Sequence, residues 1–334
     1  MKKVIILLLM VLLPVVSTLV GCSNSSGGVT TPIGLVPTKA NLVGQVDLSK
    51  ILQDKDLTGI YDKVPKNSTY PQTFDDALTQ LKDQYNIDLN SFQEGFFFAD
   101  VSGSTYQGNY TGVIVEGTFN ESDLIAAIQS AAHVQLSTIK YKDYEIYTDE
   151  LGQTAIAFLG NTTFVIGAMQ PVKDVIDVKK GDAKALSGEV LDTYNKLGDA
   201  LIKAAVSVPS GVAEGQLGQS ASQVLGNLSV FDKVQTVGMT LSKGNSSVAL
   251  NVKLCCADSD SAQSIEDSIN TLIGFAGLYI SGSGNETQNQ ALGTLLNSVE
   301  VSRSDLCVNV SLSMTVAQIE DLTQSASQGS GQSG

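Results

Sequence analysis

The sequence predicts an α+β protein with two related repeats of antiparallel sheet and with helices packed on one face. Three observations support this fold class. Short stretches of alternating apolar and polar residues recur along the chain and are separated by turn residues. Amphipathic stretches with a helical period follow pairs of these strands. The order strand, strand, helix, strand, strand, helix occurs both before and after a Gly-, Ser- and Gln-rich segment at residues 210–226, which predicts a duplication.

The N-terminus has the features of a secretory leader. Lys2 and Lys3 precede an uncharged apolar run at residues 4–20, and small residues follow at a cleavage point. The ending Leu-Val-Gly-Cys at residues 19–22 resembles the lipobox of prokaryotic lipoproteins. The resemblance implies that residues 1–21 are a signal peptide and that Cys22 carries a lipid. We therefore expect a protein anchored to the cell membrane through lipid and facing outside the cytoplasm. Without processing, residues 4–20 would form a marginal membrane anchor.

The rest of the chain divides by composition. Residues 22–34 are rich in small polar residues and predict a flexible tether. Residues 35–209 are expected to form the first α+β repeat domain, residues 210–226 the linker, and residues 227–324 the second repeat domain. Residues 325–334 are small and polar, which is typical of a disordered tail.

The elements of the first repeat follow from periodicity and from capping residues. Thr73 and Asn120 each precede an amphipathic stretch and have side chains suited to a helix N-cap, and Pro171 is suited to open a third helix. A longer helix is expected at residues 187–206. The expected strands are residues 41–48, 96–101, 112–119, 144–148, 154–159 and 163–169.

The second repeat contains the sharpest local prediction. Strands are expected at residues 236–242, 247–256, 299–302 and 306–314, with a helix after the second and after the fourth. Side-chain alternation puts Cys255 and Cys307 on the polar faces of their strands. If these strands are neighbours, the two cysteines can form a disulfide closing a loop of roughly 50 residues, worth ~4 kcal/mol. Cys256 would then be a buried thiol. A vicinal bridge between Cys255 and Cys256 and a metal site are the alternatives, but the first requires a strained turn and the second lacks a fourth ligand.

Composition and motifs argue against most enzyme classes. The net charge of −14 disfavours nucleic acid as a partner. His133 is the single histidine, and no nucleophile elbow, phosphate loop or dinucleotide fingerprint is present. We therefore predict no catalytic residue, no metal site and no cofactor. An acidic-residue hydrolase is a minor alternative, because carboxylates cluster near Asp143 and near Asp258.

Two further sets of residues are candidate sites. Three consecutive phenylalanines, Phe96, Phe97 and Phe98, are suited either to the core or to the lining of an apolar ligand cleft. Possible glycosylation sequons lie at Asn67, Asn109, Asn161, Asn245 and Asn285.

The body of the chain also resembles a family. The segment Leu35-Val36-Pro37 and the run FVIGAMQPVKDVIDV from Phe164 are similar to an uncharacterised group of prokaryotic surface lipoproteins with two such repeats. The resemblance implies no catalytic residue. The sequence therefore favours a non-catalytic lipoprotein with a binding or envelope-organising role. A carrier of lipid or of another apolar ligand, in a cleft between layers or between the repeats, is the second hypothesis. The expected partners are the membrane, through the lipid anchor, and an apolar small molecule or a protein.

Overall fold

The structure is a computed structural model that describes residues 31–64, 66, 70–102, 110–208, 229–282 and 293–321. The leader, Cys22, residues 210–226, the C-terminal tail, Asn67, Asn109 and Asn285 lie outside the described residues. The described part is mixed helix and antiparallel sheet, so the predicted α+β class is confirmed. None of its helices has the length and apolar character needed to cross a membrane.

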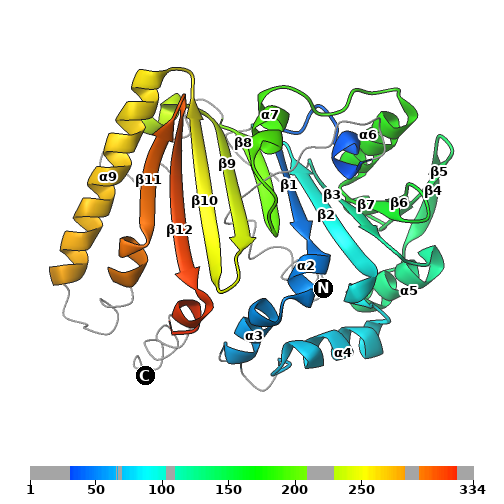
Figure 1. The fold of residues 1–334 in the computed structure, drawn as a ribbon. Coiled ribbons are helices and arrows are strands. Elements are labelled where there is room, and N and C mark those ends of the chain that lie inside the picture. The colour runs from blue at the N-terminus through cyan, green and yellow to red at the C-terminus, as the bar shows by residue number, and fades with distance from the viewer. Residues whose placement is uncertain are drawn as a thin grey trace.

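A single sheet of 12 strands crosses the molecule (Figure 1). The strand order is β11-β12-β10-β9-β8-β1-β2-β3-β7-β6-β5-β4. The strands are β1 (Leu42–Asp47), β2 (Phe92–Ala99), β3 (Thr111–Gly117), β4 (Ser137–Tyr141), β5 (Tyr144–Thr148), β6 (Ala155–Phe158), β7 (Thr163–Gly167), β8 (Ile202–Ser207), β9 (Val234–Lys243), β10 (Ser247–Cys256), β11 (Val299–Ser304) and β12 (Cys307–Thr315).

The helices pack around this sheet, and local sequence sets their ends. The hydroxyl of Thr73 caps α4 and the side chain of Asn120 caps α5, each accepting a hydrogen bond from a backbone N–H three residues later. Gly181, at φ 80°, ends α6. The helices are η1 (Pro32–Leu35), α2 (Leu48–Gln53), α3 (Lys55–Lys63), α4 (Phe74–Tyr85), η2 (Leu89–Ser91), α5 (Glu121–Ala132), α6 (Met169–Lys180), α7 (Glu189–Lys196), η4 (Ser229–Lys233) and α9 (Ser259–Gly282).

The strand order contains the duplication. Outward from the β1–β8 pair, one half of the sheet runs β1-β2-β3-β7-β6 and the other runs β8-β9-β10-β12-β11. Along the chain, α5 follows the third strand of one half and α9 follows the third strand of the other, whereas β4 and β5 have no counterpart in the second half. The second half therefore begins with β8, before residue 210, and the two halves share one continuous sheet rather than forming separate sheets joined by a linker.

Residues 187–206 are not one helix, which corrects the sequence prediction. The helix α7 ends at Lys196, and residues 202–207 form strand β8 between β1 and β9. The alanines of this stretch favour a helix when read alone, but pairing on both edges and burial of Ala204 and Ala205 stabilise a strand. Small residues suit this position, because an added Cβ on Gly44 of β1 would lie 2.4 Å from the Cβ of Ala204.

Helices also cover both faces of the sheet, not one. The helices α6 and α7 pack with η1 on the face that carries Phe96 and Ile114. The helix α5 packs on the opposite face, against Val115 and Phe164, and α9 packs on that same opposite face in the second half. The inner strands β3, β6 and β7 of the first half are therefore largely buried on both sides, as their nearly continuous apolar runs require, whereas the edge strand β4 is exposed.

Candidate functional site

One row of directly paired residues crosses all 12 strands and changes from apolar to polar side chains at its middle. Residues paired across antiparallel strands lie on the same face of a sheet. The row consists of Ile139, Ile146, Ala157, Val165, Ile114, Phe96, Gln45, Lys203, Thr240, Asn251, Ser311 and Glu300. The six members in the first half's outer strands are apolar, and every member from Gln45 onward is polar. The duplicated sheet thus presents an apolar side in one half and a polar side in the other.

The polar part of the row begins under α7 and continues beyond this helix across β9, β10, β12 and β11. Thr240, Asn251 and Ser311 are half-buried, and Glu300 is exposed. The Nδ2 of Asn251 donates a 2.8 Å hydrogen bond to Oγ1 of Thr240. The helix α9, which packs along β10, β11 and β12, lies on the opposite face, against Val308. We call this side of β9, β10, β12 and β11 the open face, defined by Thr240, Asn251, Lys253, Asn309, Ser311 and Glu300.

A buried polar cluster lies where the apolar and polar parts of the row meet. Gln45 donates a 2.9 Å hydrogen bond to Oε2 of Glu94 and accepts a 3.0 Å hydrogen bond from the hydroxyl of Tyr194. Lys203 is 2% exposed, and its Nζ lies 4.8 Å from the centroid of the Tyr194 ring. Burial raises the pKa of Glu94, and the nearby carboxylates of Asp47 and Glu116 raise it further, while Lys203 opposes the shift. The cluster joins β1, β2, β8 and α7 and is best suited to fixing the junction of the two halves.

A cleft of about 370 Å³ with charged side chains in its walls lies where α7 meets the open face. Its helical wall carries Glu189, Asp192 and Lys196, and its sheet side includes Lys253. At its base, the hydroxyls of Thr193 and Thr236 share a 2.9 Å hydrogen bond and are buried. An added Cβ on the neighbouring Gly238 would lie 2.9 Å from the Leu197 side chain, so glycine lets the C-terminal end of α7 approach β9 closely.

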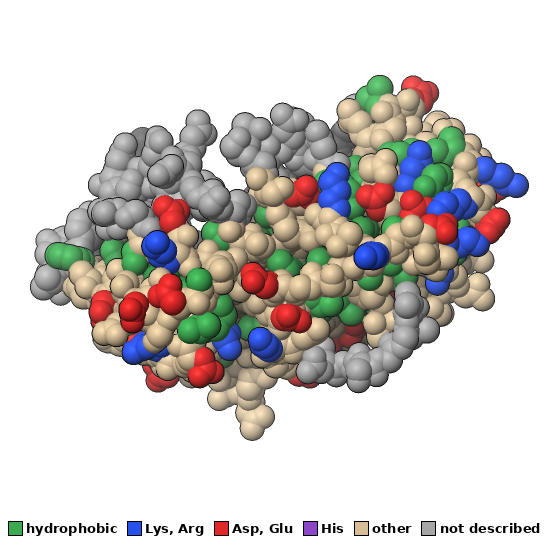
Figure 2. Space-filling view, turned by 90° about the horizontal axis from the view of Figure 1, so that it is seen from above, with side chains coloured by type: hydrophobic (Ala, Val, Ile, Leu, Met, Phe, Trp, Pro, Cys, Tyr) green, Lys and Arg blue, Asp and Glu red, His purple; other side chains and the backbone are tan. Residues whose placement is uncertain are grey.

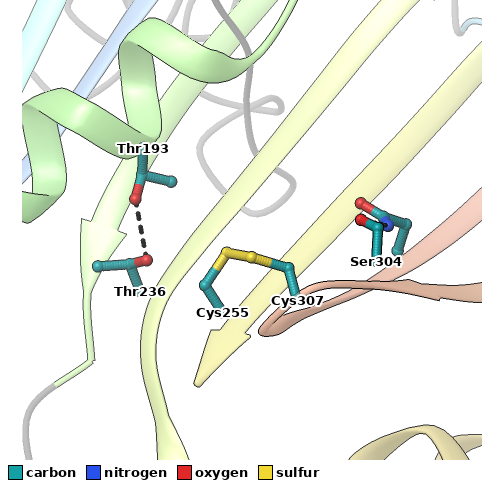
Figure 3. The surroundings of a disulfide bond; sticks show 6 residues. Thr193, Thr236, Cys255, Ser304 and Cys307 are labelled. Carbon is teal, nitrogen blue, oxygen red and sulfur yellow. Dashed lines mark hydrogen bonds between the residues drawn. A yellow bond between two sulfur atoms is a disulfide. The ribbon is translucent and has the colours of Figure 1, made fainter. Parts of the chain in front are cut away.

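The predicted disulfide between Cys255 and Cys307 is confirmed, and it lines this cleft. The two cysteines are directly paired in the β10–β12 ladder, as their shared polar face required. In Figure 3 the bridge joins the two strands, with Thr193 and Thr236 on one side and Ser304 on the other. Cys256 is 3% exposed and free, as predicted. Burial raises the pKa of its thiol.

The three phenylalanines lie in the core. Phe96 and Phe98 are 5% and 1% exposed and pack in the cluster beneath α6 and α7. Phe97 points to the opposite face, where it packs against Met239 and Val46. None of the three lines the cleft beside α7.

The remaining candidate residues lie apart from the cleft. Asn161 and Asn245 are exposed in the β6–β7 and β9–β10 turns. His133 ends α5 with a left-handed backbone conformation. Asp258 caps α9 by accepting a 2.7 Å hydrogen bond from the backbone N–H of Ser261. Among the residues that the structure describes, no group of His, Cys, Asp or Glu side chains is arranged to hold a metal ion.

Sequence reasoning did not predict the cleft. Its helical wall belongs to α7, which was expected to continue through residue 206, and its other wall depends on a strand order that alternation alone does not determine. The available signal was Gly198, which separates the apolar periodicity of α7 from the stretch Ile202–Ser207.

The surface seen in Figure 2 is mixed in charge. Acidic and basic side chains are interspersed over the described part of this face, and apolar side chains appear in small groups between them. A mixed surface of this kind is typical of a solvated protein and gives no sign of a nucleic-acid-binding stripe.

Comparisons with known proteins show similarity of fold alone. No family model matches the chain, and no curated protein matches it. The chain is similar to the solved structure titled "Structure of crystal form III of TP0453", with a TM-score of 0.50 and 7% sequence identity over 90% of this chain and 98% of that chain. Crystal forms I and IV of TP0453 give TM-scores of 0.45 at 7% and 9% identity, covering 88% and 89% of this chain and 97% and 96% of those chains.

Proposed function

We propose that the protein is a lipid-anchored extracytoplasmic lipoprotein with a non-catalytic binding role, and that the open face of its second half receives the partner. The anchor rests on the basic and apolar leader and on the lipobox ending at Cys22. The disulfide supports an oxidising compartment outside the cytoplasm.

One observation carries the binding role. The two halves share the same strand order, yet the row positions covered by α6 and α7 in the first half are Phe96, Ile114 and Val165, while the second half has Thr240, Asn251 and Ser311. The second half thus keeps the sheet and replaces the apolar contact surface with hydroxyl and amide groups. Such groups on rigid strands present hydrogen-bond donors and acceptors at fixed spacing, which suits recognition of a polar partner.

The carrier hypothesis receives no support from the described residues. An apolar ligand requires an apolar cavity without charged groups, but Phe96 and Phe98 fill the core, and five charged side chains line the cleft beside α7. The described residues give the hydrolase alternative no convergent group of catalytic side chains, because Asp258 serves as a helix cap and Asp143 forms an ion pair with Lys180.

Site-specific photo-crosslinking in intact cells tests the binding role. A photoreactive residue at Ser311, in the middle of the open face, should give a discrete crosslinked product. The same residue at Lys140, on the edge strand β4, is the matched control and should give none. The product at Ser311 should be lost when Cys22→Ser releases the protein from the membrane. Equal products at both positions would contradict a role for the open face.

A further inference from the structure

The Cys255–Cys307 disulfide lies where a small molecule can reach it. Both cysteines are half-buried, and both line the cleft of about 370 Å³ beside α7. A cleft of that volume admits a reagent of several heavy atoms. Exposed disulfides exchange more readily than buried ones, and this bridge is only half-buried.

The sheet does not depend on the disulfide for its register. The β10–β12 ladder pairs residues continuously from Ser247 with Thr315 to Cys255 with Cys307, so the bridge joins the last of nine pairs. The corresponding strands of the first half, β3 and β7, pair over five residues and end at Glu116 with Thr163, without a covalent link. The shorter β3–β7 ladder forms without a disulfide. We therefore expect the longer β10–β12 ladder to keep its strand pairing when the disulfide is lost.

The charges of the cleft select the reagent. Three carboxylates, Glu189, Asp192 and Asp305, line it together with two ammonium groups, Lys196 and Lys253. The cleft is therefore net negative, and so is the whole chain at −14. A negatively charged small molecule is repelled from such a cleft, and a positively charged one is attracted.

We propose that Cys255–Cys307 is a site of thiol–disulfide exchange with small thiols that are otherwise neutral or positively charged. The thiolate of the reagent attacks one cysteine sulfur, a mixed disulfide forms with that cysteine, and the other cysteine leaves as a thiolate that takes up a proton. A second reagent thiolate attacks the mixed disulfide, releasing the oxidised reagent and the second cysteine thiolate. Two reagent thiols are thus oxidised to one disulfide, and the protein disulfide is reduced to two thiols.

Cys256 does not take part in this exchange. It follows Cys255 directly, but it lies on the opposite side of β10, in the cluster with Ala262 and Ile265 of α9. Cys256 also borders the cleft, but only 3% of the residue is exposed, so its thiol is not accessible to a reagent there. The reaction therefore needs an external thiol, and the external thiol's charge controls its rate.

A series of three thiols tests the proposal on the full mature protein under native conditions. Cysteamine is positively charged, 2-mercaptoethanol is neutral and 3-mercaptopropionate is negatively charged; each is supplied at the same thiolate concentration. Alkylation after timed intervals and peptide mass mapping measure the reduction of Cys255–Cys307. We expect rates proportional to thiol concentration. After correction for thiol basicity, we expect the order cysteamine, mercaptoethanol, mercaptopropionate, with roughly two- to fivefold between successive reagents at low salt and a smaller difference at high salt.

Two results would overturn the proposal. A reduction rate that does not depend on thiol concentration would mean that the disulfide reacts only after the protein unfolds. Equal reduction rates with the three reagents, after correction for thiol basicity, would show that the charge of the cleft does not select the reagent. Both readings come from the unmodified protein, so they do not depend on whether a variant folds.

Matched variants locate the effect in the cleft. The double variant Glu189→Gln and Asp192→Asn should raise the rate with mercaptopropionate by roughly two- to fivefold relative to cysteamine. Glu150→Gln removes one exposed carboxylate in the β5–β6 turn, remote from the cleft, and should leave the ratio unchanged. A comparable change with Glu150→Gln would assign the preference to the charge of the whole molecule and contradict a cleft-specific site. Circular dichroism of the reduced protein should retain the native sheet signal.

Discussion

A single methyl group added at Gly44 tests how the two halves are joined. Gly44 lies in the middle of β1, between Phe97 of β2 and Ala204 of β8. An ideal Cβ there would lie 2.1 Å from Cζ of Phe97, 2.4 Å from Cβ of Ala204 and 2.6 Å from the carbonyl oxygen of Lys203. A side-chain rotation cannot relieve the contact with the carbonyl oxygen of Lys203, because that oxygen belongs to the backbone. The backbone of β8 is itself held in place by pairing on both of its edges.

The expected magnitude follows from this geometry. Added volume in a packed core costs about 1–3 kcal/mol and sometimes more, and we expect Gly44→Ala to lower the free energy of unfolding by about 3 kcal/mol. Gly95→Ala in β2 is the matched control, since its Cβ would meet only the Cγ1 of Val113, at 3.9 Å. Replacing a glycine in a compatible conformation stabilises a protein by about 0.4–1 kcal/mol. Urea unfolding measures both, and a Gly44→Ala protein as stable as Gly95→Ala would refute the close β1–β8 junction.

Three further predictions concern the stability of the folded protein. Burial and nearby carboxylates hold the pKa of Glu94 above its ordinary 4.5 in the folded state. Folding therefore favours the protonated form, and stability is lost as the pH rises through the folded pKa. The variant Glu94→Gln should flatten that loss, and an unchanged pH profile of the free energy of unfolding would contradict this prediction. Cys307→Ser with Cys255→Ser should lower the free energy of unfolding by ~4 kcal/mol, measured by urea unfolding, and equal stability with and without the bridge would disprove this. Ile265→Ala, at a fully buried position on the sheet-facing side of α9, should cost about 2–5 kcal/mol, whereas Phe275→Ala, 64% exposed on the same helix, should change stability little; equal losses would be inconsistent with the packing of α9.

Local elements were predictable where one interaction determines them. Thr73 and Asn120 are N-cap residues followed by helical periodicity, and both cap helices in the structure. Alternation alone placed Cys255 and Cys307 on the polar faces of their strands, and the disulfide was expected on the condition that these strands are neighbours, which the structure shows.

Elements that depend on distant partners were not predictable. Residues 202–207 have the alanines of a helix, and only the pairing of β8 with β1 and β9 makes them a strand. The same pairing merges the two halves into one sheet and moves the start of the second half ahead of residue 210. The cleft could not be predicted for the same reason, because its walls come from residues that lie close together only in the folded sheet.

The helices on both faces illustrate a further limit. The sequence shows that α5, α6 and α9 each have an apolar side, but it does not show toward which side of the sheet each one crosses. The connection lengths and the strand order decide that, and they place α6 opposite α5 and α9. The polar character of β10 and β12 on one side was visible in the sequence; that it faces away from α9 required the structure.

The mass of the N-terminal peptide tests anchored display most directly. Trypsin acting on protein taken from the membrane fraction should release a peptide that begins at Cys22 and ends at Lys39. The account predicts that this peptide carries the added mass of acyl chains, and that the Cys22→Ser variant leaves the membrane fraction. An unmodified Cys22 within a longer peptide that retains residues of the leader would contradict it.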